Sequence, residues 1–162
     1  RPVMLYEPNH RSAEALSKTL PYLDISSKGM YANSTGFKDN RAWVRWGVEQ
    51  EVKAIAAVKP AAVPYSVLWM AGDPDAAEVP LIPAWTRHDV YLSLVSGARG
   101  IIVWSGFRRA KFDTFDAYLE GYTSAARELT GKAGLGQVFL FGERRSDLQV
   151  KVTEGPETQT VD

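Results

Sequence analysis

Residues 87–106 read RHDVYLSLVSGARGIIVWSG, and this stretch decides the fold class. Apolar residues at Val90 and Leu94 have helical spacing, and Gly97 stands where a left-handed residue commonly ends a helix. Residues 101–104 then form a continuous apolar run, which is typical of a parallel strand covered on both faces. The step from a helix to a buried strand predicts an α/β protein, in which chemistry gathers beyond the carboxyl ends of the strands.

Strand-and-helix units also occur on either side of this stretch. We expect four parallel strands, adjacent in chain order, at about residues 3–6, 23–27, 62–70 and 101–104. The helices between and after them are expected at about residues 12–20, 40–58, 87–96 and 114–130. Four parallel βα units form half of a TIM-type barrel or a small open sheet, and the long loops at 28–36 and 71–83 favour the barrel.

The carboxyl-terminal part of the chain has a different pattern. We assign residues 1–134 to the four βα units and residues 135–162 to a short C-terminal β-hairpin with a polar tail. Period-two spacing predicts the two hairpin strands at 138–141 and 148–152. Half a barrel has bare edges on its first and last strands, so we expect a missing N-terminal half or another copy of the chain to pack against them.

Composition narrows the class of protein. The chain has 162 residues, 19 of them basic and 19 acidic, which suits one domain and gives no support for a nucleic-acid or membrane partner. The absence of cysteine excludes disulfides and cysteine metal sites, and it favours a periplasmic or secreted protein. No nucleotide-binding glycine motif occurs and the two histidines lie far apart in the chain, so we expect neither a cofactor nor a metal.

Part of the chain resembles a known family. Residues 87–106, with Gly-Ala-Arg-Gly between helix and strand and Trp-Ser at the strand end, resemble the seventh helix and eighth strand of many (βα)8-barrel glycoside hydrolases. The segment that follows is similar to the junction where such barrels pass into a C-terminal β-sandwich. The resemblance implies that residues 1–7 and 24–31 hold the fifth and sixth strands and that the first four units are missing. It also implies cleavage of glycosidic bonds by two carboxylates facing one bond.

Two carboxylates are candidates for that chemistry. The resemblance places a nucleophilic Glu at the tip of the seventh strand, but residues 68–73 read LWMAGD and contain no Glu. Asp73 is the nearest carboxylate to that tip, and Glu7 directly follows the first strand, so Glu7 and Asp73 are the candidate catalytic residues. Each also has a structural interpretation: Glu7 can cap or pair with the next helix, and Asp73 lies in a Gly-Asp-Pro-Asp turn.

Candidate substrate-binding residues also follow the strand ends. Aromatic side chains there suit stacking on the apolar face of a sugar ring, and they equally suit packing of a barrel mouth. The candidates are Asn9, His10, Lys28, Tyr31, Trp69, Trp104 and Arg108. Because parallel strands end on one side of a sheet, we expect the side chains at the strand ends to ring a single cleft that takes an oligosaccharide or polysaccharide.

Three functions are open at this point. The chain can be the C-terminal half of a carbohydrate-active barrel hydrolase. It can be a carbohydrate-binding barrel without catalysis, which the missing Glu favours. It can also be a self-assembling βα half-barrel of unknown function.

Overall fold

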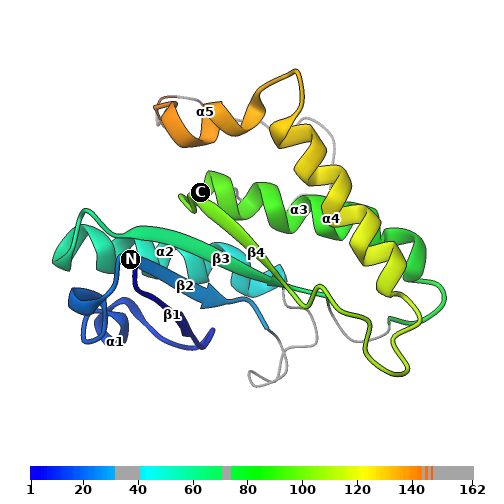
Figure 1. Ribbon diagram of the computed structural model, residues 1–162, viewed down its shortest axis with the longest axis horizontal. Helices are drawn as coiled ribbons and strands as arrows, with labels where there is room; N and C mark the ends of the chain where they lie inside the picture. The colour runs from blue at the N-terminus through cyan, green and yellow to red at the C-terminus, as the bar shows by residue number, and fades with distance from the viewer. Residues whose placement is uncertain (32–40, 71–73, 144, 146, 148–162) are drawn as a thin grey trace, which may run out of the picture.

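The computed structural model describes residues 1–31, 41–70, 74–143, 145 and 147, and its centre is a four-stranded parallel sheet (Figure 1). The strands are β1 (Met4–Glu7), β2 (Ile25–Gly29), β3 (Val63–Trp69) and β4 (Gly100–Trp104). They pair in the order β1-β2-β3-β4, with every neighbour parallel. The predicted strands, their direction and their order are therefore confirmed.

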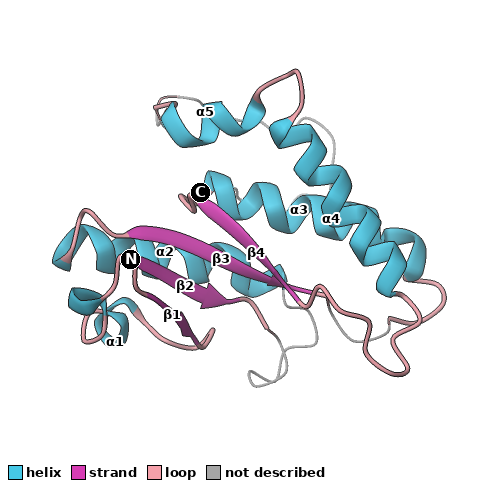
Figure 2. Cartoon of the chain, in the orientation of Figure 1, coloured by secondary structure: helices cyan, strands magenta, loops and turns pink. Residues whose placement is uncertain are grey.

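Helices alternate with these strands, as Figure 2 shows. They are α1 (Ala13–Leu16), α2 (Arg41–Val58), α3 (Ile82–Val95), α4 (Phe115–Thr130) and α5 (Leu135–Phe141), with short 3-10 helices η1 (Leu20–Tyr22) and η2 (Val79–Leu81). Contacts of α2 with β2 and β3, and of α3 with β3 and β4, place these two helices against the sheet. The α4 helix packs on α3, and α5 packs on α4.

The alternation of side chains assigns each face of the sheet. Ser26 of β2 donates a hydrogen bond to Glu51 of α2, and Ser93 of α3 donates one to Ser66 of β3. The register places Ser26 and Ser66 on the same face, because Ser66 pairs with Lys28, two residues after Ser26. The α2 and α3 helices therefore cover one face, which we call the helix face, and the opposite face is called the open face.

The main core lies between the helix face and the helices. Its members come from β3, β4, α2, α3, α4 and the connections between elements, and they include Met30, Val48, Leu68, Ile82 and Tyr118. A smaller cluster joins α1 to the end of α2 through Leu16, Leu20 and Ile55 among others. The core therefore covers one face of the sheet, and the apolar side chains of the strands that point to the helix face are buried in it.

The open face and the outer strand edges lack such cover. Met4 is 50% exposed and Trp104 is 50% exposed, although both are large and apolar. Within the described residues, no strand pairs with the outer edge of β1 or of β4. The sheet is therefore open, and the barrel is not closed by the part of the chain that the structure describes.

Gly97 ends α3 as the sequence predicts. Its φ of +114° is a conformation that favours glycine, and a Cβ on it would lie 2.9 Å from a methyl group of Val52. The helix itself begins at Ile82 rather than near Arg87, directly after η2, with Pro83 in its first turn. The predicted loop 71–83 is therefore partly helical.

The first predicted helix is shorter than expected. Ser12 does cap α1, because its hydroxyl accepts a hydrogen bond from the Ala15 amide. However, α1 ends at Leu16, and Pro21 lies inside η1 instead of closing a longer helix. The last long helix agrees with the prediction, since α4 begins after Thr114 and ends before Gly131.

The predicted β-hairpin is wrong in its first strand. Residues 138–141 lie in α5, which starts after Gly134 in the left-handed region, at φ 60°. Tertiary contacts hold this helix: the Phe139 ring meets Tyr91 at 5.9 Å, and the Arg99 guanidinium donates hydrogen bonds to carbonyls in its last turn. The second predicted strand, 148–152, lies outside the described residues.

Candidate functional site

Aromatic rings line the carboxyl ends of the strands on the open face. Tyr6 stacks on Tyr31 with ring centres 5.8 Å apart, and Tyr31 meets Trp69 at 5.7 Å. Trp104 is the register partner of Trp69, so its ring extends the row to β4. We call Tyr6, Tyr31, Trp69 and Trp104 the ring surface. Phe107 meets Trp104 at 6.5 Å and prolongs it.

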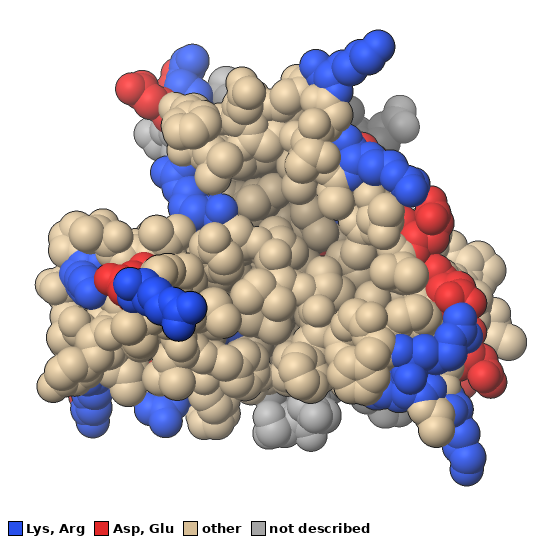
Figure 3. Space-filling view, in the orientation of Figure 1, with Lys and Arg blue, Asp and Glu red and all other residues tan. Residues whose placement is uncertain are grey.

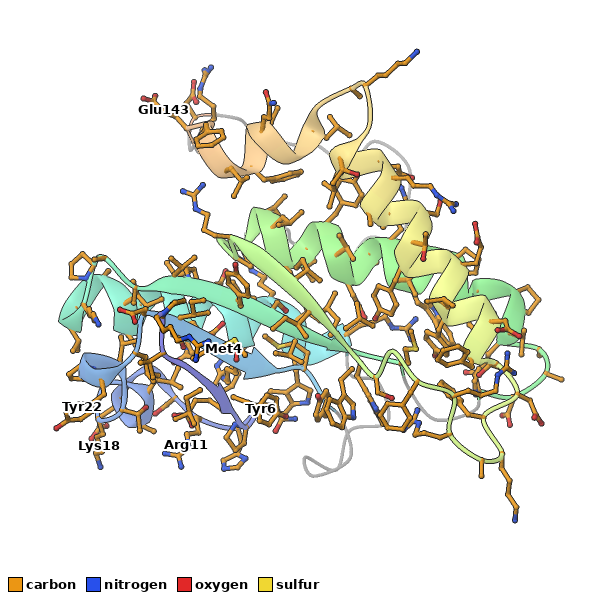
Figure 4. The ribbon with its side chains drawn as sticks, in the orientation of Figure 1. Met4, Tyr6, Arg11, Lys18, Tyr22 and Glu143 are labelled. Atoms are coloured by element: carbon orange, nitrogen blue, oxygen red, sulfur yellow. The ribbon has the colours of Figure 1, made fainter. Side chains whose placement is uncertain are left out.

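Local backbone geometry makes room for these rings. A Cβ on Gly29 would lie 2.1 Å from the Tyr6 hydroxyl oxygen, so the glycine lets the Tyr6 ring lie across β2. Met4 and Tyr6 project from β1 on the same face (Figure 4), because they are two residues apart in a strand. The row of rings is thus a consequence of strand register and of one position without a side chain.

The open face carries little charge. In Figure 3, the side chains of Lys, Arg, Asp and Glu lie mainly around the margin of the face turned to the viewer, and its centre is uncharged. The ring surface is also partly accessible, since Tyr6 is 43% exposed and Trp104 is 50% exposed. An uncharged, aromatic and accessible surface suits a neutral ligand with apolar faces.

Glu7 lies on the helix face, opposite the ring surface. Only 2% of it is exposed; its carboxylate pairs with the Arg11 guanidinium at 3.0 Å and accepts a hydrogen bond from Thr19 at 2.7 Å. These contacts favour a structural role for Glu7, although its partners Arg11 and Thr19 flank α1 and do not belong to the helix. Its predicted catalytic role stays a prediction without geometric support.

Lys28 is also on the helix face and is fully buried. Its ammonium donates a hydrogen bond to the Arg11 carbonyl at 2.7 Å and lies 3.9 Å from the centre of the Trp46 ring. Burial lowers the pKa of Lys28 to about 8, although the negative charges of Glu51 and Glu7 raise it. Lys28 therefore serves an internal network and does not reach the open face.

Glu51 of α2 completes this buried network. It accepts a hydrogen bond from Ser26 at 2.9 Å through one carboxyl oxygen, while the other oxygen has no hydrogen-bond partner among the described residues. Burial raises the pKa of Glu51 well above its usual value, and the hydrogen bond from Ser26 and the charge of Lys28 act in the opposite direction. Sequence reasoning missed Glu51, which lies in mid-helix without any motif.

The remaining candidates are dispersed. Asn9 is buried, and its amide donates a hydrogen bond to the Tyr31 carbonyl, whereas His10 is exposed in the same loop. The Arg108 guanidinium is bound to Asp116 on α4 and lies 5.2 Å from the Phe115 ring. Asp73 lies outside the described residues.

The single cleft expected from the sequence is therefore not formed as predicted. The structure brings Tyr31, Trp69 and Trp104 together on the open face, but it places Glu7 and Lys28 on the other face. The reason is the strand period of two: residues next to each other in a strand point to opposite faces. The same rule would have found Tyr6, which the sequence analysis missed, because it precedes Glu7.

The described residues also form a groove of about 510 Å³. This groove lies away from the ring surface and is bounded by α2, the end of α3 and α5, with Arg45, Val95, Arg99 and Val138 in its lining. No group of three or more potential metal ligands occurs in the described residues. None of the helices in that part of the chain has the length and apolar character needed to cross a membrane.

Comparison of the chain with protein-family models, with curated proteins and with solved structures gives no match.

Proposed function

We propose that the ring surface binds a neutral carbohydrate, and that the chain contributes this surface to a TIM-type barrel protein of the glycoside hydrolase kind. The supporting observation is the row of Tyr6, Tyr31, Trp69 and Trp104 at the strand ends. The C–H groups on a pyranose face pack well on aromatic rings, and ring edges and hydroxyls leave room for hydrogen bonds. A phosphorylated or strongly anionic ligand is disfavoured, because no cation belongs to this row.

Binding is the form of the proposal that the geometry supports best. Hydrolysis needs two carboxylates on either side of one glycosidic bond, and Glu7 is bound to Arg11 and Thr19 on the helix face. The hydrolase form therefore depends on Asp73 and on carboxylates from strands beyond these four. The resemblance of residues 87–106 to barrel hydrolases is what favours that form.

The proposal also requires further strands. Four parallel strands whose outer edges are unpaired within the described residues could form half of an eight-stranded barrel, and the exposed Met4, Tyr6 and Trp104 side chains would line its interior or its mouth. A missing N-terminal half or a second copy of the chain would supply these strands. A periplasmic or secreted location, where polysaccharides are accessible, fits the same proposal.

The test is saccharide binding by the protein and by ring variants. Isothermal titration with soluble oligosaccharides should show binding that falls about tenfold or more in Trp69→Ala and in Trp104→Ala, since each change removes one stacking partner. Tyr22→Ala is the matched control, because Tyr22 is 78% exposed in η1, which precedes the amino end of β2. Equal loss in the control variant, or no saccharide binding by the unmodified protein, refutes the proposal.

Hydrolysis is tested separately. Release of reducing sugar by the unmodified protein would establish the hydrolase form, and its persistence in Glu7→Gln would remove Glu7 from the chemistry. Loss of turnover in Glu7→Gln with unchanged stability would instead restore Glu7 as a catalytic residue, against its position on the helix face.

A further inference from the structure

The loop between β1 and α1 is held by side chains from other elements. Lys28 of β2 donates to the Arg11 carbonyl at 2.7 Å, and Gln50 of α2 accepts a hydrogen bond from the Ala13 amide at 2.9 Å. Asn9 of the loop donates to the Tyr31 carbonyl, just beyond the end of β2. The loop is thus fixed at one end to the helix face and at the other to the residue that carries the central ring of the ring surface.

Lys28 is an unusual residue for this position. It is fully buried in the helix face, where an apolar side chain of similar volume would avoid the desolvation of a charge. The acidic side chains that face it are Glu7 of β1 and Glu51 of α2, while the Trp46 ring covers its ammonium. These surroundings offset only part of the cost of burial, and within the described residues the hydrogen bond of its ammonium goes to the loop backbone at Arg11.

We propose that Lys28 is a positioning residue for the ring surface: its ammonium anchors residues 8–12 to the sheet, and the anchored loop holds Tyr31 through Asn9. This inference rests on the proposed function in one respect, namely that the ring surface is the place where carbohydrate binds. The anchoring itself does not depend on any ligand.

The consequence for binding is indirect. The Tyr31 ring lies between those of Tyr6 and Trp69, at 5.8 and 5.7 Å, so a displacement of Tyr31 disturbs three of the four rings. Lys28 lies on the opposite face of the sheet, so it makes no contact with a ligand bound at the ring surface. Its replacement should therefore weaken binding without removing any contact to the ligand.

The main variant is Lys28→Met, which keeps the length of the side chain and removes the charge. Lys59→Met is the matched control: Lys59 follows α2 and pairs with Asp24 at 3.5 Å, near the amino end of β2 and away from the loop. Two readouts need no ligand. Amide hydrogen exchange reports the anchoring of residues 8–13, and the NMR shifts of the Tyr31 ring protons report the ring currents of its two neighbours.

In Lys28→Met we expect loop amides to exchange about tenfold faster or more, because a hydrogen bond from a charged donor has been lost. The NMR shifts of the Tyr31 ring protons should move towards those of a tyrosine without aromatic neighbours. The affinity for oligosaccharide should fall in parallel. Lys59→Met should leave all three unchanged. Unchanged exchange and unchanged Tyr31 shifts in a folded Lys28→Met overturn the inference.

A second variant keeps the inference testable if Lys28→Met does not fold. Asn9→Ala breaks the link between the loop and Tyr31, so the Tyr31 shifts and the affinity should change as in Lys28→Met, while the Arg11 end of the loop stays protected. Unchanged NMR shifts of the Tyr31 ring in Asn9→Ala would show that Asn9 does not hold Tyr31 in place, which overturns this step of the inference. If the unmodified protein binds no saccharide, the proposed function fails, whereas exchange and ring shifts still decide whether Lys28 positions Tyr31.

Discussion

The buried ammonium of Lys28 should make the stability of the protein depend on pH in a defined direction. Burial lowers the pKa of this group from 10.5 to about 8 in the folded protein. Between these values the unfolded chain holds its proton while the folded protein has released it. The unfolded state then binds more protons, so the free energy of unfolding rises with pH over this window.

The size of the effect follows from the same shift. The slope is at most about 1.4 kcal/mol per pH unit, and the whole window amounts to about 3 kcal/mol. Lys28→Met lacks the titrating group, so the contribution should be absent in that variant. The titration of other groups overlaps with that of Lys28. Burial raises the pKa of Tyr6 and Tyr31, which makes stability fall with pH close to 10, and burial raises the pKa of Glu51.

The assay is urea unfolding at pH 7 to 9.5, with the variant and its parent measured in a Glu51→Gln background to remove the carboxyl titration. The free energy of unfolding of the parent minus that of Lys28→Met should rise with pH by about 1 kcal/mol per unit over this range. The rise should start at a lower pH than in the protein with Glu51, because Glu51 no longer raises the pKa of Lys28. Lys59→Met, with a partly exposed ammonium, should give a difference that does not change with pH. A pH-independent difference for Lys28→Met would show that its ammonium is not desolvated as the structure indicates.

Other changes have equally definite outcomes. Glu51→Gln should gain stability relative to the parent in urea unfolding as pH rises above 5, because the pKa of Glu51 is raised in the folded protein and the unfolded chain loses this proton first; a constant difference contradicts this. Gly97→Ala should lower the free energy of unfolding by about 1–3 kcal/mol, since its φ is +114° and its Cβ site is occupied. Gly134→Ala should lower the free energy of unfolding by less, because a Cβ on Gly134 would have no other atom within 4 Å. Equal losses for the two variants in thermal melts would exclude a steric contribution from Val52 at Gly97. Glu7→Gln should cost about 1 kcal/mol through weaker bonds to Arg11 and Thr19, measured in the same way, and no loss would mean that these bonds do not matter. Light scattering of the isolated chain should give a mass above 17.9 kDa if a second copy covers the open face, whereas a stable monomer with both sheet edges solvated counts against the half-barrel.

The sequence by itself determined the parallel sheet and its order. Strands with a continuous apolar run favour parallel pairing, and helices between them permit right-handed crossovers that place each strand beside the previous one. The end of α3 was also determined locally, because the conformation of Gly97 is one that other residues rarely adopt. These features depend on residues close together in the chain.

Tertiary structure alone decided the rest. Residues 135–141 became a helix because Tyr91 and Arg99 hold it, and both lie far away in the sequence. The period of two separates Tyr6 from Glu7, but it does not say which of them faces the helices. That choice was made by the partners of Glu7 and Lys28, namely Thr19, Arg11 and Trp46, whose positions are fixed only when α1 and α2 pack on the sheet.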